Sequence, residues 1–299
     1  ALELIDENNK GPQIIIIAPT RELSQQIKKV VDNIGSLTKY LKTTLLIGGI
    51  SSEDNAKCLR ENPQIVIGCP GRIYDMIQRK HLTTEYMKTI IIDEADEILS
   101  PGFKEQIYNI FQKLPSNVQV ALFSATMPNE IYNLTNKFMR DPVKILVKTE
   151  MLTLEGINQF YINLTDDTEK YDTLKDLFSS ISVSQCIIYC NSVTRVSDLY
   201  DAMTQDNFPV CRIHSNMDKD ERHRNYKDFI AGTYRVLISS NLTARGIDIQ
   251  QVSTVINFDI PGCVNTYLHR IGRSGRWGRK GTGINFITKR DIKRLREIE

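Results

Sequence analysis

Residues 88–96 read Lys-Thr-Ile-Ile-Ile-Asp-Glu-Ala-Asp, an apolar run of strand length that ends in acidic residues. The three isoleucines are β-branched and uninterrupted, which predicts a strand buried on both faces of a parallel sheet. Asp93 and Glu94 would then lie at the carboxyl end of this strand, where open α/β sheets bind ligands. Adjacent carboxylates at that edge favour a hydrated Mg²⁺ that carries nucleotide phosphates. The alternative is that Asp93 and Asp96 only cap a following helix.

The bulk composition predicts a globular protein without a strong overall charge. The length of 299 residues suggests about two domains, and the hydrophobic fraction of 41% is ample for globular cores. The formal net charge is only +2, so any binding of nucleic acid must come from a local patch. Residues 260–299 hold ten Lys or Arg against three acidic residues, a balance that suits a polyanion or, equally, a solvated helix.

The six cysteines are scattered without the paired spacing of a metal site. We interpret them as reduced thiols of an intracellular protein. The first residues are acidic and lack the regions of a signal peptide, and no apolar run approaches the length of a membrane span. We therefore expect an intracellular, cytoplasmic protein that does not enter a membrane.

Four further strands that precede turns are predicted in the first half, over residues 13–18, 45–47, 65–68 and 119–123. In the same order, the turns after these strands contain Pro19, Thr20 and Arg21; Gly48 and Gly49; Cys69, Pro70, Gly71 and Arg72; and Ser124, Ala125 and Thr126. Thr20 is placed to cap a helix whose free N–H groups could hold a phosphate. Glycines let a ligand backbone approach closely, and hydroxyl groups could bond to the acidic site. Each turn alone could be an ordinary connection, but together they predict one sheet edge dedicated to binding.

The alternation of strands and helices begins again after a predicted strand at residues 143–147 and a linker. Strands are predicted over residues 158–162, 185–189, 210–214, 235–239, 254–258 and 283–287, which indicates a second α/β domain. Residues 244–248 follow the fourth of them, where Gly246 permits close approach and Asp248 could bond a ribose hydroxyl or anchor the loop. In residues 269–276, arginines three apart suit the charge on a transferring phosphoryl group, and two glycines argue against a plain solvated helix.

These motifs together resemble those of the DEAD-box RNA helicases. Pro-Thr-Arg-Glu-Leu, Gly-Gly, Pro-Gly-Arg, Asp-Glu-Ala-Asp, Ser-Ala-Thr, Ala-Arg-Gly-Ile-Asp and His-Arg-Ile-Gly-Arg-Ser-Gly-Arg occur in the order of that family. Stretches between the motifs look closest to its translation initiation factor 4A branch. The resemblance implies an α/β fold with two RecA-like domains, each a mainly parallel sheet with helices on both faces. We expect the first over residues 1–147, a linker over 148–156 and the second over 157–299.

The resemblance also implies roles for single residues. Glu94 would polarise the attacking water, and Asp93 with Glu94 would hold Mg²⁺ through water. The further ATP-site residues implied are His269, Arg273 and Arg276 as catalytic groups and Gly246 and Asp248 as nucleotide contacts. The residues implied to hold the RNA backbone, whatever its base sequence, are Pro19, Thr20, Arg21, Gly49, Gly71 and Arg72. The residues implied to couple hydrolysis to domain closure are Ser124, Thr126 and Asp96.

The chain departs from the family pattern at several places. The phosphate-binding loop Gly-x-x-x-x-Gly-Lys-Thr or -Ser does not occur in the 299 residues, and in relatives it precedes residue 13. We therefore expect a fragment with an incomplete first domain, which would bind ATP weakly and be inactive or weakly active. Smaller departures are Cys69 for a threonine, Ser215 for a glycine, Lys219 for a glutamine and Asn241 for an aspartate.

Three functions are compatible with these residues. The first is an ATP-dependent RNA helicase that binds single-stranded RNA, unwinds duplexes locally and serves in translation initiation or RNA remodelling. It would be a monomer that uses ATP and Mg²⁺ and works with an accessory protein such as a translation scaffold. The second is a hydrolysis-incompetent RNA clamp or scaffold, and the third is a Mg²⁺ phosphodiesterase, for which further acidic ligands are lacking.

Overall fold

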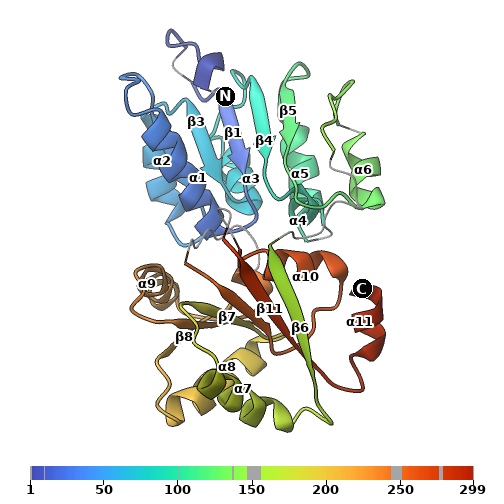
Figure 1. Cartoon of the computed structure of the whole chain (residues 1–299). Helices are drawn as coiled ribbons and strands as arrows, with labels where there is room; N and C mark the ends of the chain where they lie inside the picture. The colour runs from blue at the N-terminus through green and yellow to red at the C-terminus, as the bar shows by residue number, and fades with distance from the viewer. Residues whose placement is uncertain are drawn as a thin grey trace. The chain divides into compact units, whose positions relative to one another are not determined.

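The structure is a computed structural model that describes residues 2–9, 11–100, 102–136, 138–146, 156–243, 251–275 and 279–298. The chain divides into two compact units, Ala1–Ile145 and Leu146–Glu299 (Figure 1). The linker predicted at residues 148–156 lies, apart from Gly156, outside the described residues, so its limits and those of the two domains stay a prediction.

The first unit is built on five parallel strands in the order β2-β3-β1-β4-β5. The strands are β1 (Ile14–Ile17), β2 (Thr43–Leu46), β3 (Ile65–Gly68), β4 (Thr89–Ile92) and β5 (Gln119–Leu122). The helices are η1 (Leu2–Leu4), α1 (Arg21–Ile34), α2 (Ser52–Arg60), α3 (Pro70–Gln78), α4 (Ala95–Ile98), α5 (Lys104–Phe111) and α6 (Asn129–Thr135). In the central register Ile14 lies opposite both Ile65 and Thr89.

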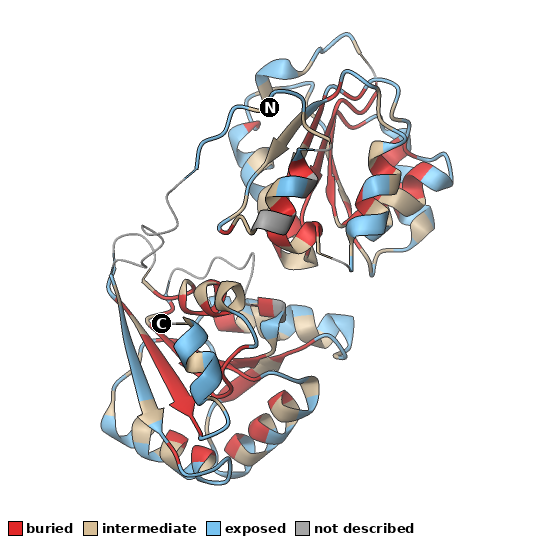
Figure 2. Cartoon of the chain, turned by 90° about the vertical axis from the view of Figure 1, so that its right-hand side faces the viewer, coloured by how far each residue is buried: buried red, intermediate tan, exposed pale blue. Residues whose placement is uncertain are grey.

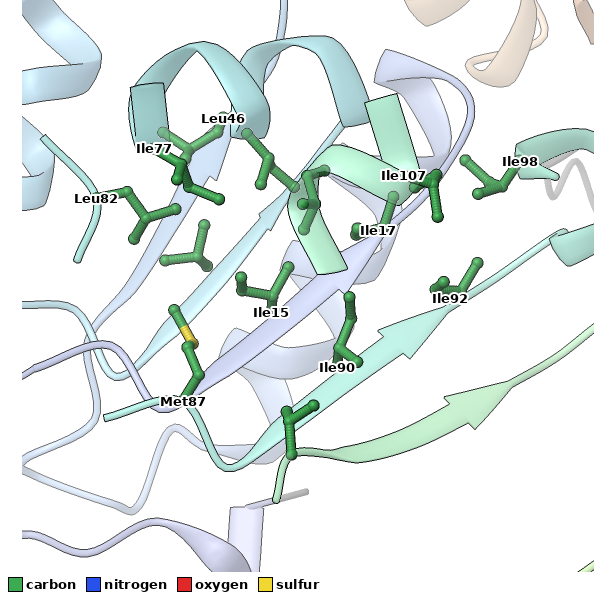
Figure 3. Packing of buried hydrophobic residues seen from close by; sticks show 14 of the residues in the cluster. Ile15, Ile17, Leu46, Ile77, Leu82, Met87, Ile90, Ile92, Ile98 and Ile107 are labelled. Atoms are coloured by element: carbon green, nitrogen blue, oxygen red, sulfur yellow. The ribbon is translucent and has the colours of Figure 1, made fainter. Parts of the chain in front are cut away.

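The β-branched runs of β1, β3 and β4 make the centre of this sheet apolar on both faces, and helices cover each face. On one face Ile15, Ile17 and Ile90 pack with residues of α3 and α5 (Figure 3). On the other face Ile14 and Ile16 pack with Ile27 and Val31 of α1, among others. The strands are therefore fixed on both sides, so that the residues after them start from a rigid edge.

The second unit repeats this design with six parallel strands in the order β6-β11-β10-β7-β9-β8. The strands are β6 (Ile157–Asn163), β7 (Cys186–Tyr189), β8 (Val210–Ile213), β9 (Val236–Ser239), β10 (Thr254–Asn257) and β11 (Gly281–Ile287). The helices are α7 (Glu169–Ser180), α8 (Val193–Gln205), α9 (Lys219–Ile230), η3 (Asn241–Thr243), α10 (Val264–Ile271) and α11 (Ile292–Ile298). Separate apolar clusters involve α7 and α8 on one face and α9 and α10 on the other, and the residues of β7, β9 and β10 between them are buried (Figure 2).

Two parallel sheets with helices on both faces confirm the predicted fold class. One prediction is wrong: residues 143–146 of the strand expected at 143–147 form no strand, and residue 147 is not described. Val143 and Ile145 are 90% and 93% exposed, so this apolar segment lacks the neighbouring strand that a ladder requires. None of the described helices has the length and apolarity needed to cross a membrane.

Candidate functional site

The strand order of the first unit sorts the predicted site residues into two groups. The ends of β2, β3 and β1 are neighbours, and they carry Gly49, Gly71, Arg72 and the turn 19–21. The ends of β4 and β5 are neighbours on the other side of β1, and they carry the acidic residues and the turn 124–126. One sheet edge therefore presents basic and glycine-rich turns on one half and carboxylates on the other.

The end of β4 makes an abrupt turn at Glu94. This residue has a φ of +51°, in the left-handed region that residues other than glycine rarely adopt. Its N–H donates to Oδ1 of Asp93 at 2.9 Å, and the N–H of Ala95 donates to the carbonyl of Phe123 at 2.9 Å. Such backbone strain concentrates at functional sites, where the surrounding structure holds it in place.

The electrostatics of Asp93 fit a metal ligand. Burial raises the pKa of its carboxyl, the hydrogen bond from Glu94 opposes this, and the charge of Asp96 raises it further. No basic group of the described chain contributes to the shift. A carboxylate that is partly removed from water and faces another acid is stabilised by a cation, and oxygen ligands are those that Mg²⁺ prefers. Asp93 with Glu94 can therefore serve as the oxygen side of a hydrated Mg²⁺ site.

Asp96 connects the segments that follow β4 and β5, the two strands on the acidic half of the edge. Ser124 Oγ donates to Asp96 Oδ1 at 3.0 Å, and Thr126 Oγ1 donates to Asp96 Oδ2 at 2.8 Å. Asp96 and Thr126 are both buried, so these bonds form away from water and fix the turn after β5 to the start of α4. The cross-strand contact expected from the hydroxyl residues is present in the structure, while its role in coupling stays a prediction.

At the other half of the edge, Thr20 caps α1 by accepting the N–H of Leu23 at 3.3 Å. The guanidinium of Arg21 lies against Gly48, where an added Cβ would be 3.1 Å from one of its nitrogens. Gly49 follows with a φ of +103°, a conformation that favours glycine. The glycines and the arginine therefore occupy one place, as their spacing suggested.

Arg72 is held by a residue that the sequence did not single out. Its NH1 donates to Asn55 Oδ1 at 2.7 Å, and Asn55 Nδ2 donates to the carbonyl of Leu45 at 3.3 Å. Asn55 is only 1% exposed, so it links α2 and α3 to β2 and restricts the guanidinium. No pattern marks this asparagine, because its partner on α3 lies 17 positions away.

In the second unit, His269 and Arg273 are both more than nine-tenths buried. Arg273 Nε donates to the carbonyl of His269 at 3.1 Å. The helix that carries His269 ends at Ile271 with Gly272 as its cap, so Arg273 lies after the helix, in keeping with the glycines that argued against one continuous helix. The predicted site residues Gly246, Asp248 and Arg276 lie outside the described residues.

A buried charge network lies beside this helix and was also missed from the sequence. The carboxylate of Asp259 accepts bonds from Arg195 at 2.7 and 3.1 Å and from Lys170 at 3.0 Å. Burial raises the pKa of Asp259, but the hydrogen bond from Arg195 and the charge of Lys170 outweigh it and lower the pKa below its usual range. The strand end after β10 is thereby anchored to α7 and α8.

Known proteins carry the same organisation. The family model for the DEAD/DEAH box helicase matches residues 1–134, and the model for the helicase conserved C-terminal domain matches residues 169–278. The ATP-dependent RNA helicase eIF4A of Scheffersomyces stipitis is 52% identical over all of this chain and 75% of its own length. The structure of S. cerevisiae Dbp5 bound to RNA and ADP BeF3 has a TM-score of 0.91 at 30% identity, covering 99% of this chain and 77% of that one. The structure of Mss116p bound to ssRNA and AMP-PNP has a TM-score of 0.88 at 25% identity, covering 99% and 63%.

Proposed function

The chain belongs to the DEAD-box helicases as an ATP-dependent RNA helicase of the eIF4A type, and we propose that it binds the backbone of single-stranded RNA, unwinds duplexes locally and serves in translation initiation or RNA remodelling. The observation that carries this proposal is the division of one sheet edge into a basic, glycine-rich half and an acidic half. Such an edge offers separate places for two phosphate-bearing ligands.

The acidic half would act on ATP. Bound Mg²⁺ would neutralise charge on the phosphates, with Asp93 and Glu94 holding it through water. Glu94 would orient and polarise the attacking water, and its strained backbone supports a fixed carboxylate position. Arg273 and Arg276 would bind the charge that develops on the γ-phosphate, and Asp248 would bond the ribose.

The basic half would hold RNA through its phosphates and sugars. Arg72, restrained by Asn55, and Arg21, placed against Gly48, would pair with phosphate oxygens. Gly49 and Gly71 would let the RNA backbone approach closely, since neither has a side chain. Contacts of this kind carry no base information, so binding would be indifferent to sequence.

The decisive experiment is RNA-stimulated ATP hydrolysis. It is measured with the chain as printed and with the chain preceded by a segment that contains the Gly-x-x-x-x-Gly-Lys-Thr loop. In whichever form is active, Glu94→Gln should lower hydrolysis by about 100-fold or more and leave ATP-dependent RNA binding intact. Glu97→Gln, an acid on the short helix α4 that follows Glu94, is the matched control and should keep the parent rate.

The RNA half has its own test. Arg72→Ala should weaken binding of a single-stranded RNA of any sequence and reduce the salt slope of log K by about 0.7. Arg60→Ala, which removes an exposed cation from α2, should change neither. Unchanged binding in Arg72→Ala would contradict the assigned RNA edge.

A clamp is the competing function, and the same assay separates it. RNA binding without hydrolysis in either form of the chain would favour the clamp over the enzyme. We also propose an accessory protein partner, because one structure of the similar yeast protein Dbp5 is bound to Gle1.

A further inference from the structure

Arg270 is a cation at a fully buried position. Its side chain is 0% exposed, and it is the largest fully buried side chain in the part of the chain that the structure describes. It is the second-last residue of α10, and its guanidinium lies 5.2 Å from the ring centre of Tyr189. A charge at such a place needs a partner at every N–H, since each buried donor without one is costly.

All five N–H donors of this guanidinium are used. Nε donates to Asn241 Oδ1 at 2.9 Å, and NH2 donates to the same oxygen at 2.5 Å and to Asn191 Oδ1 at 2.8 Å. NH1 donates to Asn257 Oδ1 at 3.1 Å and to the carbonyl of Asp259 at 2.7 Å. The side chain therefore has no donor left for a nucleotide or for RNA.

Every one of these acceptors is neutral. Among the described residues, the carboxylate that acts on Arg270 is that of Asp259, and it is already occupied by Arg195 and Lys170. Burial lowers the pKa of Arg270 to about 10, which still leaves the group charged at neutral pH. The position where the family resemblance leads one to expect an aspartate holds Asn241, so hydrogen bonds rather than an ion pair hold this cation in the described part of the unit.

The acceptors come from three strand ends. Asn191 follows β7, Asn257 ends β10, and Asn241 opens η3 directly after β9. Segment 244–250, with the predicted nucleotide contacts, continues from η3, and α10 carries His269 next to Arg270. The guanidinium thus connects two segments that are 29 positions apart in the chain.

We propose that Arg270 and Asn241 form a positioning pair that holds α10, and with it His269 and Arg273, in a fixed place relative to η3. This inference rests on the proposed function, because those residues are the ones assigned to ATP. Arg270 acts through its neighbours and touches neither ligand. Asn241 accepts two of the five bonds and is exposed, so it can be replaced without emptying the core.

Hydrogen exchange tests the pair independently of activity. In Asn241→Ala, the amides of residues 241–243 and of residues 264–275 should both exchange about tenfold faster, as expected from losing a hydrogen bond to a charged group. Asn241→Asp accepts the same two bonds with a carboxylate and should restore or exceed the parent's protection. Asn163→Ala, an exposed asparagine at the end of β6, is the control and should leave both segments unchanged.

Kinetics then test the positioning role. Asn241→Ala should lower the kcat of RNA-stimulated hydrolysis about tenfold with the KM for RNA unchanged, and Asn241→Asp should recover it. Faster exchange confined to residues 241–243, or equal behaviour of the alanine and aspartate variants, would overturn the pair. If the parent shows no hydrolysis either as printed or with the preceding loop segment, the proposed function fails, and the exchange result alone decides whether α10 and η3 are held together.

Discussion

Replacing Asp259 by asparagine measures how much a buried charge network contributes to the second unit. The carboxylate accepts bonds from Arg195, from Lys170 and, at 3.1 Å, from the N–H of Asn191. An asparagine keeps one oxygen but turns an NH2 group toward two cations. The Lys170 side chain is only 4% exposed, so water cannot replace the lost charge.

The expected cost follows from that burial. Removing one partner of a buried ion pair leaves an uncompensated charge and costs about 3–5 kcal/mol. Lys170 retains Asp167 at 2.8 Å, and the Arg195 side chain is 34% exposed, so the lower end applies. We expect Asp259→Asn to lower the free energy of unfolding of this unit by about 3 kcal/mol at pH 7.

Urea unfolding provides the assay, followed by circular dichroism and by the fluorescence of the single tryptophan, Trp277, which belongs to the second unit. Asp172→Asn is the control, because its side chain is 78% exposed and its pairing with Lys175 should contribute less than about 0.5 kcal/mol. A loss below about 1 kcal/mol in Asp259→Asn would refute the reasoning.

The same network sets a pH dependence. The pKa of Asp259 is lowered in the folded state, so its stabilisation is present above the unfolded value of about 3.9 and disappears as the pH falls through the folded value. The difference in unfolding free energy between the parent and Asp259→Asn should therefore be constant near neutral pH. It should decrease as the pH falls below about 4.

Three other predictions concern packing, a hydrogen bond and thiol chemistry. Gly68→Ala should lower the free energy of unfolding, measured by thermal unfolding, by about 3 kcal/mol or more, because the new Cβ would lie 2.0 Å from the carbonyl oxygen of Leu46. Gly102→Ala is the control: its new Cβ meets nothing within 4 Å, so the loss should be under about 0.5 kcal/mol. Thr126→Val should cost about 1–3 kcal/mol in the same assay, since it removes a buried bond to Asp96; an unchanged midpoint would contradict this. Iodoacetamide at pH 8 should modify the two exposed thiols of the folded chain and spare the three buried ones, as read by mass spectrometry. Burial raises the pKa of Cys190 and of Cys211 to about 12, so these thiols stay protonated. Rapid labelling of the buried thiols without denaturant would contradict the fold. The exposed thiols are Cys58 and Cys263, and the buried ones are Cys186, Cys190 and Cys211.

The strands were predictable because their apolar runs are uninterrupted. The strand predicted over residues 65–68 has the observed bounds. The strand predicted over residues 13–18 is observed as Ile14–Ile17, one residue shorter at each end than predicted. The prediction at 45–47 missed Thr43 and Thr44, because β2 lies at the sheet edge and alternates between half-buried and buried residues. The wrong strand at 143–147 is also rich in apolar residues, although Lys144 interrupts it, and its described residues pair with no strand.

The site was predictable to the level of strand ends, but its supporting contacts were not. Parallel strands bring their carboxyl ends to one edge, which is why the turns after β1 to β5 could be assigned to it from their residue types. The contacts of Asn55 with Arg72 and of Asn241 with Arg270 join residues 17 and 29 positions apart. These contacts depend on the order of the strands and on the length of the side chains. Neither contact repeats at a regular spacing in the sequence, so no pattern could have predicted it.

Backbone hydrogen bonds explain why the two halves of the edge should respond together. The N–H of Cys69 donates to Leu46, that of Ala18 to Gly68, that of Asp93 to Ile17 and that of Phe123 to Ile92, each at 2.8–3.0 Å. Each bond lies directly before a predicted ligand turn or at its first residue, so the ladder fixes the position of each of these turns relative to its neighbour. A side chain forced between β2 and β3 must separate this ladder on the basic side, and β1 connects that side to Asp93. Gly68→Ala should therefore weaken RNA binding and ATP hydrolysis in parallel, and loss of one with full retention of the other would show that the halves are positioned independently.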